Sequence, residues 1–132
     1  MSLSISTVVN LPFEDTVART RAVLADQGFG VLTEINVTQT LKTKLDEDME
    51  NYLILGACNP QLAHRALGVQ RQIGLLLPCN VVVRSDPTDP ASTIVEAMNP
   101  DLMVEVSGEA GLGPIAQEAT EKLTAAIAAL NA

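Results

Sequence analysis

The segment from Tyr52 to Cys58 is almost wholly apolar, and it constrains the fold of this chain more than any other segment. A short apolar run between turn residues is typical of a strand that lies inside a sheet with both faces buried. Asn59-Pro60 ends this run, and three consecutive valines at residues 81–83 predict a second interior strand. The fold is therefore predicted to be organised around a sheet.

Three further segments contribute to the predicted sheet. Residues 3–11 alternate with a period of two, and residues 31–36 follow a glycine that releases the chain into a strand. Residues 92–98 form the last predicted strand, which the turn-forming sequence at 86–90 separates from residues 81–83. We expect these last two strands to form an antiparallel hairpin with a long loop.

Helices are predicted where apolar residues recur at helical spacing. The clearest covers residues 113–130, which start with a Gly-Pro pair and carry an apolar stripe on one face. A second covers residues 12–28, with proline at its start and glycine at its end, and a short one covers residues 61–67. In residues 37–50, apolar side chains at every fourth position favour a helix, although residues 41–45 also fit a short alternating strand.

Together these elements predict an α+β fold, in which helices pack on one face of a mostly antiparallel sheet of about five strands. A chain of 132 residues suits one core, so a single domain is expected to span residues 1–132. Hydrophobic residues make up 47% of the chain, while the aromatic residues are limited to Phe13, Phe29 and Tyr52. The core is therefore predicted to be aliphatic.

The charge of the chain limits its partners. Eight Lys and Arg residues against sixteen Asp and Glu residues give a formal net charge of −8, and an acidic surface repels phosphate. We therefore expect neither nucleic acid nor an anionic membrane as a partner. The first residues lack the basic start of a secretory signal, and the apolar residues 73–83 are too few to cross a bilayer, which takes about 20 residues. We expect a cytoplasmic protein with reduced cysteines.

Cys58 and Cys79 are the strongest candidates for functional residues. Cys58 ends one predicted strand just before a helix start, where backbone N–H groups and the helix dipole favour the thiolate. Cys79 lies at the start of the next predicted strand. If these strands pair antiparallel, both thiols lie at one edge of the sheet; if they are parallel, the thiols lie at opposite edges.

A metal site is one interpretation of this edge. His64 lies on the short helix after Cys58, and Glu34 lies on a strand that is otherwise largely apolar. With Cys58 and Cys79 they offer two thiols, an imidazole and a carboxylate, which are adequate ligands for zinc or a similar metal, although their spacing matches no standard zinc pattern. In the competing interpretation the cysteines are small buried hydrophobic residues and the other two side chains face solvent.

Residues 28–35, 55–60 and 74–81 together resemble a bacterial and archaeal family, the domain of unknown function family numbered 302. The resemblance extends from the first strand to about Met103, and its most specific parts are the two segments that contain the cysteines. It implies a β-α-β(4)-α arrangement similar to the TATA-binding-protein-like fold, often found as a homodimer, with the two cysteine-bearing strands in an antiparallel meander. It implies no activity, because none is assigned to the family.

Three functional hypotheses remain open. The leading one is a cytoplasmic homodimer that acts as a binding or sensing module, with a metal or small ligand near Cys58, Cys79, His64 and Glu34. The second is a thiol-dependent enzyme or redox switch that uses Cys58 as its nucleophile. The third is a plain protein-interaction domain whose dimer surface is its whole function.

Overall fold

The structure, a computed structural model, describes residues 2–132 and contains five strands and five α-helices in that range. The strands are β1 (Ser4–Val9), β2 (Gly30–Asn36), β3 (Tyr52–Cys58), β4 (Cys79–Asp86) and β5 (Asp89–Met98). The helices are α1 (Phe13–Asp26), α2 (Val37–Leu45), α3 (Pro60–Val69), α4 (Asp101–Ser107) and α5 (Gly113–Ala129), with short 3-10 helices η1 (Arg71–Leu76) and η2 (Ala110–Leu112).

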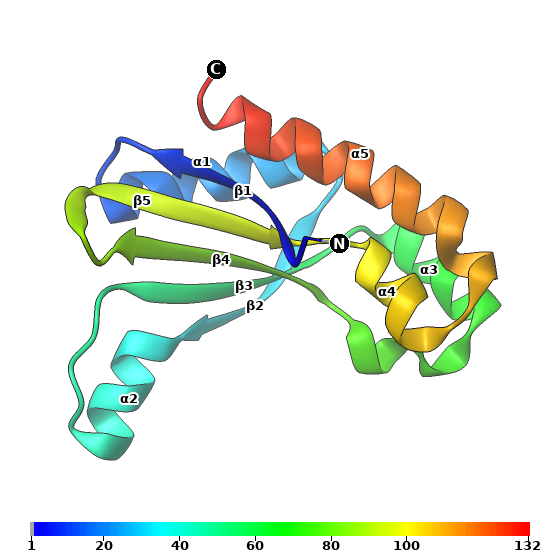
Figure 1. The fold of residues 1–132 in the computed structure, drawn as a ribbon, viewed down its shortest axis with the longest axis horizontal. Helices are drawn as coiled ribbons and strands as arrows, with labels where there is room; N and C mark the ends of the chain where they lie inside the picture. Colours follow the sequence, from blue (N-terminus) through cyan, green and yellow to red (C-terminus); the bar gives the residue numbers. More distant parts are fainter. Residues whose placement is uncertain (1) are drawn as a thin grey trace.

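All five strands form one sheet in the order β1-β5-β4-β3-β2, and every neighbouring pair is antiparallel. The predicted α+β class and the five-stranded antiparallel sheet are therefore confirmed. Figure 1 shows α1 and α5 running along the sheet, while α3 and α4 gather at one end of the molecule and α2 lies at the other. The strands that carry the two cysteines, β3 and β4, are neighbours in the interior of the sheet.

The main hydrophobic cluster fills the space between the sheet and helices α1 and α5. Alternate residues of the interior strands point into it, among them Leu55, Val81 and Val95, all of which are fully buried. Leu24 of α1 and Leu123 of α5 meet them from the helix side. The long terminal helix forms as predicted, since the apolar residues of α5 that face the core recur at helical spacing.

A second hydrophobic cluster lies at the end of the molecule where α3 and α4 gather (Figure 1). It brings together Leu62 of α3, Ile73 of η1, Met103 of α4 and Ile115 near the start of α5. Helix α5 is long enough to reach both clusters, since Leu123 belongs to the first of them. The molecule thus has two neighbouring cores that share one helix.

The opposite face of the sheet is less covered, which corrects one prediction about β3. Leu53, Leu55 and Ala57 are buried, whereas Tyr52 and Ile54, which point to the other face, are only half-buried. The apolar composition of β3 thus does not mean burial on both faces. We call this less covered side the open face, and its side chains include Val8 at 50% exposure.

Three further details refine the predicted elements. Residues 37–45 form helix α2, so the alternative strand over residues 41–45 is wrong. The hairpin loop between β4 and β5 is short rather than long, because β4 ends at Asp86 and β5 begins at Asp89. Within this loop the carboxylate of Asp86 accepts hydrogen bonds from the backbone N–H and hydroxyl of Thr88, at 2.9 and 2.8 Å. Helix α4, which follows the predicted break after Met98, has no counterpart among the predicted segments.

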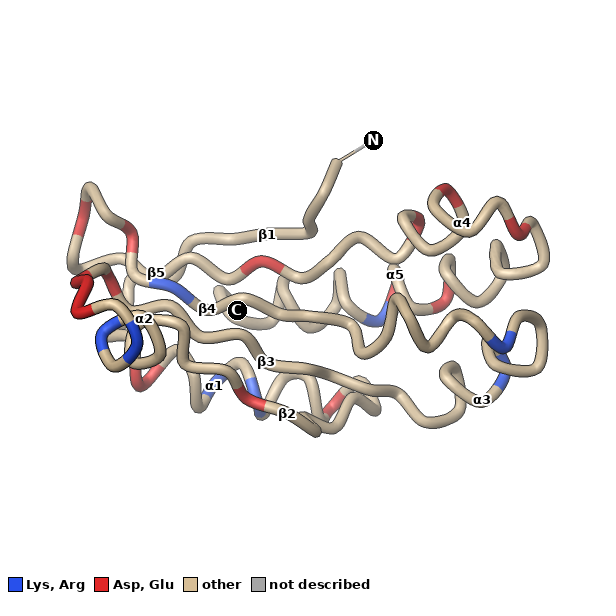
Figure 2. Tube along the Cα trace, turned by 90° about the horizontal axis from the view of Figure 1, so that it is seen from below, with Lys and Arg blue, Asp and Glu red and all other residues tan. Residues whose placement is uncertain are grey.

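Acidic side chains are spread over the surface of the molecule. Figure 2 shows them at both ends, around α2 and the β4–β5 turn on one side and on α4 on the other. Lys42 lies within the first group and pairs with Asp46 and Asp48 at 2.9 and 3.1 Å. No helix within residues 2–132 combines the length and the apolar character needed to span a membrane.

Candidate functional site

The antiparallel pairing of β3 and β4 brings the two cysteines to the same side of the sheet, where β3 ends and β4 begins. Ala57 pairs directly with Cys79, so Cys58, the last residue of β3, lies diagonally across from the first residue of β4. Of the two pairings that the sequence left open for these strands, parallel and antiparallel, the structure has the antiparallel one. Helix α3 begins at Pro60, so only Asn59 separates it from Cys58 at the end of β3.

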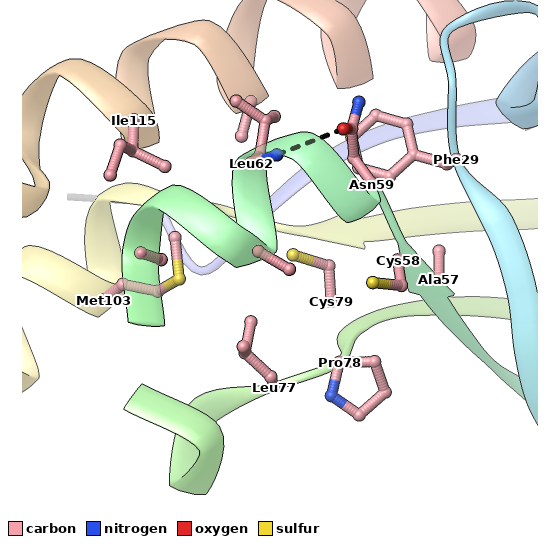
Figure 3. A pocket seen from close by; sticks show the side chains of 13 residues that line it. Phe29, Ala57, Cys58, Asn59, Leu62, Leu77, Pro78, Cys79, Met103 and Ile115 are labelled. Atoms are coloured by element: carbon pink, nitrogen blue, oxygen red, sulfur yellow. Dashed lines mark hydrogen bonds between the residues drawn. The ribbon is translucent and has the colours of Figure 1, made fainter. Parts of the chain in front are cut away.

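Both cysteines line one small cavity of about 30 Å³. Figure 3 shows their sulfur atoms pointing to the same side, into the space beside α3, with Met103 beyond Cys79 in that view. The cavity lies between the two hydrophobic clusters, because Phe29 and Ala57 belong to the first and Met103 to the second. Its walls are almost entirely apolar.

The two thiols differ in their exposure. Cys58 is half-buried and Cys79 is 8% exposed, and both are free thiols. Burial raises the pKa of the Cys79 thiol to about 11, and the neighbouring charge of Cys58 raises it further in the same direction. At neutral pH Cys79 is therefore a protonated thiol, while Cys58 is the one that reagents from solvent can reach.

Asn59 links the cavity to the start of α3. Its side-chain oxygen accepts a hydrogen bond from the backbone N–H of Leu62 at 3.3 Å, which caps the helix (Figure 3). Among the described residues that line the cavity, Asn59 has the one polar side chain other than the thiols. The first turn of α3, all of it described, carries no acidic residue, so the positive end of the helix dipole beside Cys58 is not neutralised by a side chain.

Gly56 allows one wall of the cavity to approach the sheet. A Cβ atom at this position would lie 2.0 Å from Thr33 Oγ1 and 2.8 Å from Pro78 Cγ, and both distances are shorter than real contacts. Pro78 lines the cavity and directly precedes Cys79. The missing side chain at residue 56 therefore lets the segment that positions Cys79 pack against β3.

The structure does not bring His64 or Glu34 to the cysteines. His64 is exposed on α3 and is not part of the cavity wall. Glu34 is on β2, where its carboxylate pairs with the guanidinium of Arg21 on α1. Within residues 2–132 no three His, Cys, Asp or Glu side chains are close enough to hold a metal ion together. The four-residue zinc site of the sequence prediction is therefore not assembled.

Met103 is the site residue that sequence reasoning missed. Its side chain is 3% exposed and lines the cavity from α4. The available signal is weak: Leu102, Met103 and Val104 form a short apolar run after Asn99-Pro100. A seven-residue helix such as α4 shows too little periodicity for this run to be assigned to a particular face.

Comparison with known proteins finds relatives of unknown activity. The family described as "Domain of unknown function DUF302" matches residues 5–130. Among solved structures, the chain is similar to the crystal structure of an uncharacterized conserved protein DUF302 from Bacillus stearothermophilus. The two are 28% identical over 97% of this chain and 98% of the other, with a TM-score of 0.88. No curated protein matches the chain.

Proposed function

The chain belongs to the DUF302 family, which has no assigned activity, and we propose that it is a binding or sensing module whose ligand site is the cavity lined by Cys58 and Cys79. One observation carries this proposal: two free thiols from neighbouring strands line the same apolar cavity. A small ligand there is surrounded by apolar side chains and meets two sulfur atoms. Such a cavity suits a small thiophilic ligand better than a polar metabolite.

The difference between the thiols gives the first prediction. At pH 8 we expect iodoacetamide to alkylate Cys58 in the folded protein and to leave Cys79 almost unmodified. Cys79 should react at least about a hundredfold more slowly than a free thiol, because its pKa of about 11 leaves little thiolate. Peptide mass mapping over time gives both rates, and the unfolded protein, in which both thiols react as free ones, is the control.

Ligand binding is tested on the same thiols. Native mass spectrometry of protein purified without chelators should detect a bound species that also slows alkylation of Cys58. The Cys58→Ser, Cys79→Ser double variant, which has no thiol to alkylate, should lack the bound species in the same mass spectrum. If native protein and double variant behave alike, the cavity is not a ligand site and a plain interaction domain is the better account. A Cys58–Cys79 disulfide after treatment with a hydroperoxide, without any bound species, would favour the redox switch instead.

The proposal places the protein in the cytoplasm. Reducing compartments keep neighbouring cysteines as thiols, and the cavity needs both thiols free to bind a thiophilic ligand. Oxidation of the pair would remove two thiol protons and two electrons and would join the two sulfur atoms that line the cavity. The ligand site is therefore available only where the thiols stay reduced.

We further propose that the open face of the sheet is where two copies of the chain pair. It carries exposed apolar side chains, including Val8 and Ile35 at 50% and 51% exposure. Beside them Arg84 Nε donates to Glu96 Oε1 at 2.7 Å. In a two-fold dimer the same surface meets itself, so a face with one cation and one anion presents complementary charges to its copy.

A pair of charged substitutions tests this dimer. Val8→Asp with Ile35→Asp should raise the dimer dissociation constant at least about tenfold, because buried carboxylates would face each other across the interface. Leu75→Asp is the matched control, since Leu75 is 83% exposed on η1, away from the sheet. Sedimentation velocity over a concentration series measures the constant. A wild-type protein that stays monomeric throughout, or a control that dissociates equally, contradicts the proposal.

A further inference from the structure

We propose that the ligand of this cavity is a copper(I) ion held by Cys58 Sγ and Cys79 Sγ, with Met103 Sδ as a third, weaker ligand. The inference rests on the proposed function, because it assigns a chemical class to the ligand of the same cavity. It keeps the two cysteines of the predicted zinc site but differs from that site in its ion and in its third ligand, since it uses neither His64 nor Glu34.

The cavity is lined by sulfur atoms, which favour a soft metal ion. Three sulfur-containing side chains reach it from three elements: Cys58 from β3, Cys79 from β4 and Met103 from α4 (Figure 3). Thiolate and thioether sulfur are soft ligands, and they select soft ions such as copper(I) over magnesium, calcium or manganese. Met103, at 3% exposure, lines the same cavity on the side of Cys79 away from Cys58 in Figure 3, and its thioether is the third sulfur there.

Zinc does not fit the same position. A structural zinc ion takes four ligands, which are either four thiolates or thiolates combined with imidazole. His64 is exposed on α3, and Glu34 of β2 is paired with Arg21 of α1. Within the described part of the chain no third His, Cys, Asp or Glu joins the two cysteines. A monovalent ion that accepts two or three sulfur ligands can bind with this small number of ligands, whereas zinc cannot.

The net charge of the loaded site is compatible with its position beside α3. On binding, both thiols release their protons to solvent, so two thiolates and one monovalent cation leave a single negative charge at the site. The N-terminal end of α3 lies beside Cys58, and its partial positive charge favours that negative charge. The half-buried position of Cys58 leaves this charge partly solvated. A divalent ion such as zinc would be neutral with the same two thiolates but would lack the further ligands that complete its coordination within the described residues.

The test is a competition for copper(I) between the reduced protein and bicinchoninate, without oxygen and with a thiol-free reductant. We expect one ion per chain. Cys58→Ser and Cys79→Ala should each lower the copper(I) affinity at least about 100-fold, and Met103→Leu should lower it about tenfold. Loss of a residue that only supports a metal ligand lowers affinity by about 10- to 100-fold, so the cysteines are expected at or above the upper end of that range and the weaker ligand at the lower end. Met98→Leu is the matched control: Met98 packs against the second cluster but does not line the cavity, so its affinity should equal that of the native protein.

The Met103→Leu variant keeps the test meaningful if a cysteine variant fails to fold, because leucine and methionine have similar volumes. X-ray absorption of the copper-loaded protein should show only sulfur neighbours. Nitrogen or oxygen neighbours, equal affinity in Met103→Leu and Met98→Leu, or zinc binding as tight as copper(I) binding would each overturn the inference. If copper(I) does not bind while another ligand protects Cys58 from alkylation, only the ion is wrong. If nothing protects Cys58, the proposed function falls as well.

Discussion

Replacing Gly56 with alanine is expected to lower the free energy of unfolding by about 2–3 kcal/mol, at the upper end of the usual cost of overpacking. The new Cβ would lie 2.0 Å from Thr33 Oγ1 and 2.8 Å from Pro78 Cγ. Thr33 can rotate its hydroxyl away, but the proline ring is rigid, so the segment before Cys79 must move. Urea denaturation of the purified variant measures the loss.

Two further variants separate the causes of this loss. Thr33→Ala removes the nearer obstacle, so the Gly56→Ala, Thr33→Ala double variant should recover part of the stability, and the remainder reports the clash with Pro78. Gly30→Ala is the matched control on the neighbouring strand, because a Cβ there meets no heavy atom of the described chain within 4 Å. Its effect should stay within about 0.5 kcal/mol. If the control and Gly56→Ala cost the same, the close packing of β3 against Pro78 is contradicted.

The buried thiol of Cys79 is expected to make the protein less stable in alkaline solution. Its pKa is raised from 9.0 to about 11 in the folded protein, so the folded state holds the proton more tightly than the unfolded state does. Below pH 9 both states are protonated and the full stability is present. As the pH rises from 9 to 11, the unfolded chain loses its proton first, and the free energy of unfolding falls by about 2–3 kcal/mol.

Comparison of variants isolates this loss from that of other titrating groups. Cys79→Ala should lack it, so the difference in unfolding free energy between native protein and variant should shrink between pH 9 and 11. Cys58→Ala should retain most of it, because burial is a larger cause of the raised pKa than the charge of Cys58. Urea denaturation at a series of pH values gives these differences. Parallel pH profiles for native protein and Cys79→Ala would mean that Cys79 is not sealed from water.

Segments with a strong local pattern were predictable from sequence. The strand from Tyr52 to Cys58 and the helix that begins at Gly113 both form as expected, because the first is a short apolar run between turn residues and the second has apolar residues at helical spacing. The antiparallel pairing that joins the two cysteines was one of two stated alternatives. A sequence pattern fixes the period of a strand but not the direction of its neighbour, so only the fold could decide between them.

The composition of the site was harder to predict, because it depends on where separate elements pack. Glu34 has a suitable carboxylate, but β2 places it next to Arg21 rather than at the cysteines. His64 is on the expected helix, yet on its exposed side. Met103 reaches the cavity only because α4 folds back over α3 and η1, and no local pattern around residue 103 records that packing.

The position of the cavity between two separately packed cores has a mechanical consequence. Phe29 and Ala57 on one side are packed with the sheet, while Leu62 and Met103 on the other are packed with the helices at the end of the molecule. Packed interiors resist compression and transmit strain, so we expect an occupant of this cavity to hold the two clusters more rigidly against each other. Loss of the occupant should then reduce the rigidity of the whole molecule rather than that of the cavity walls alone.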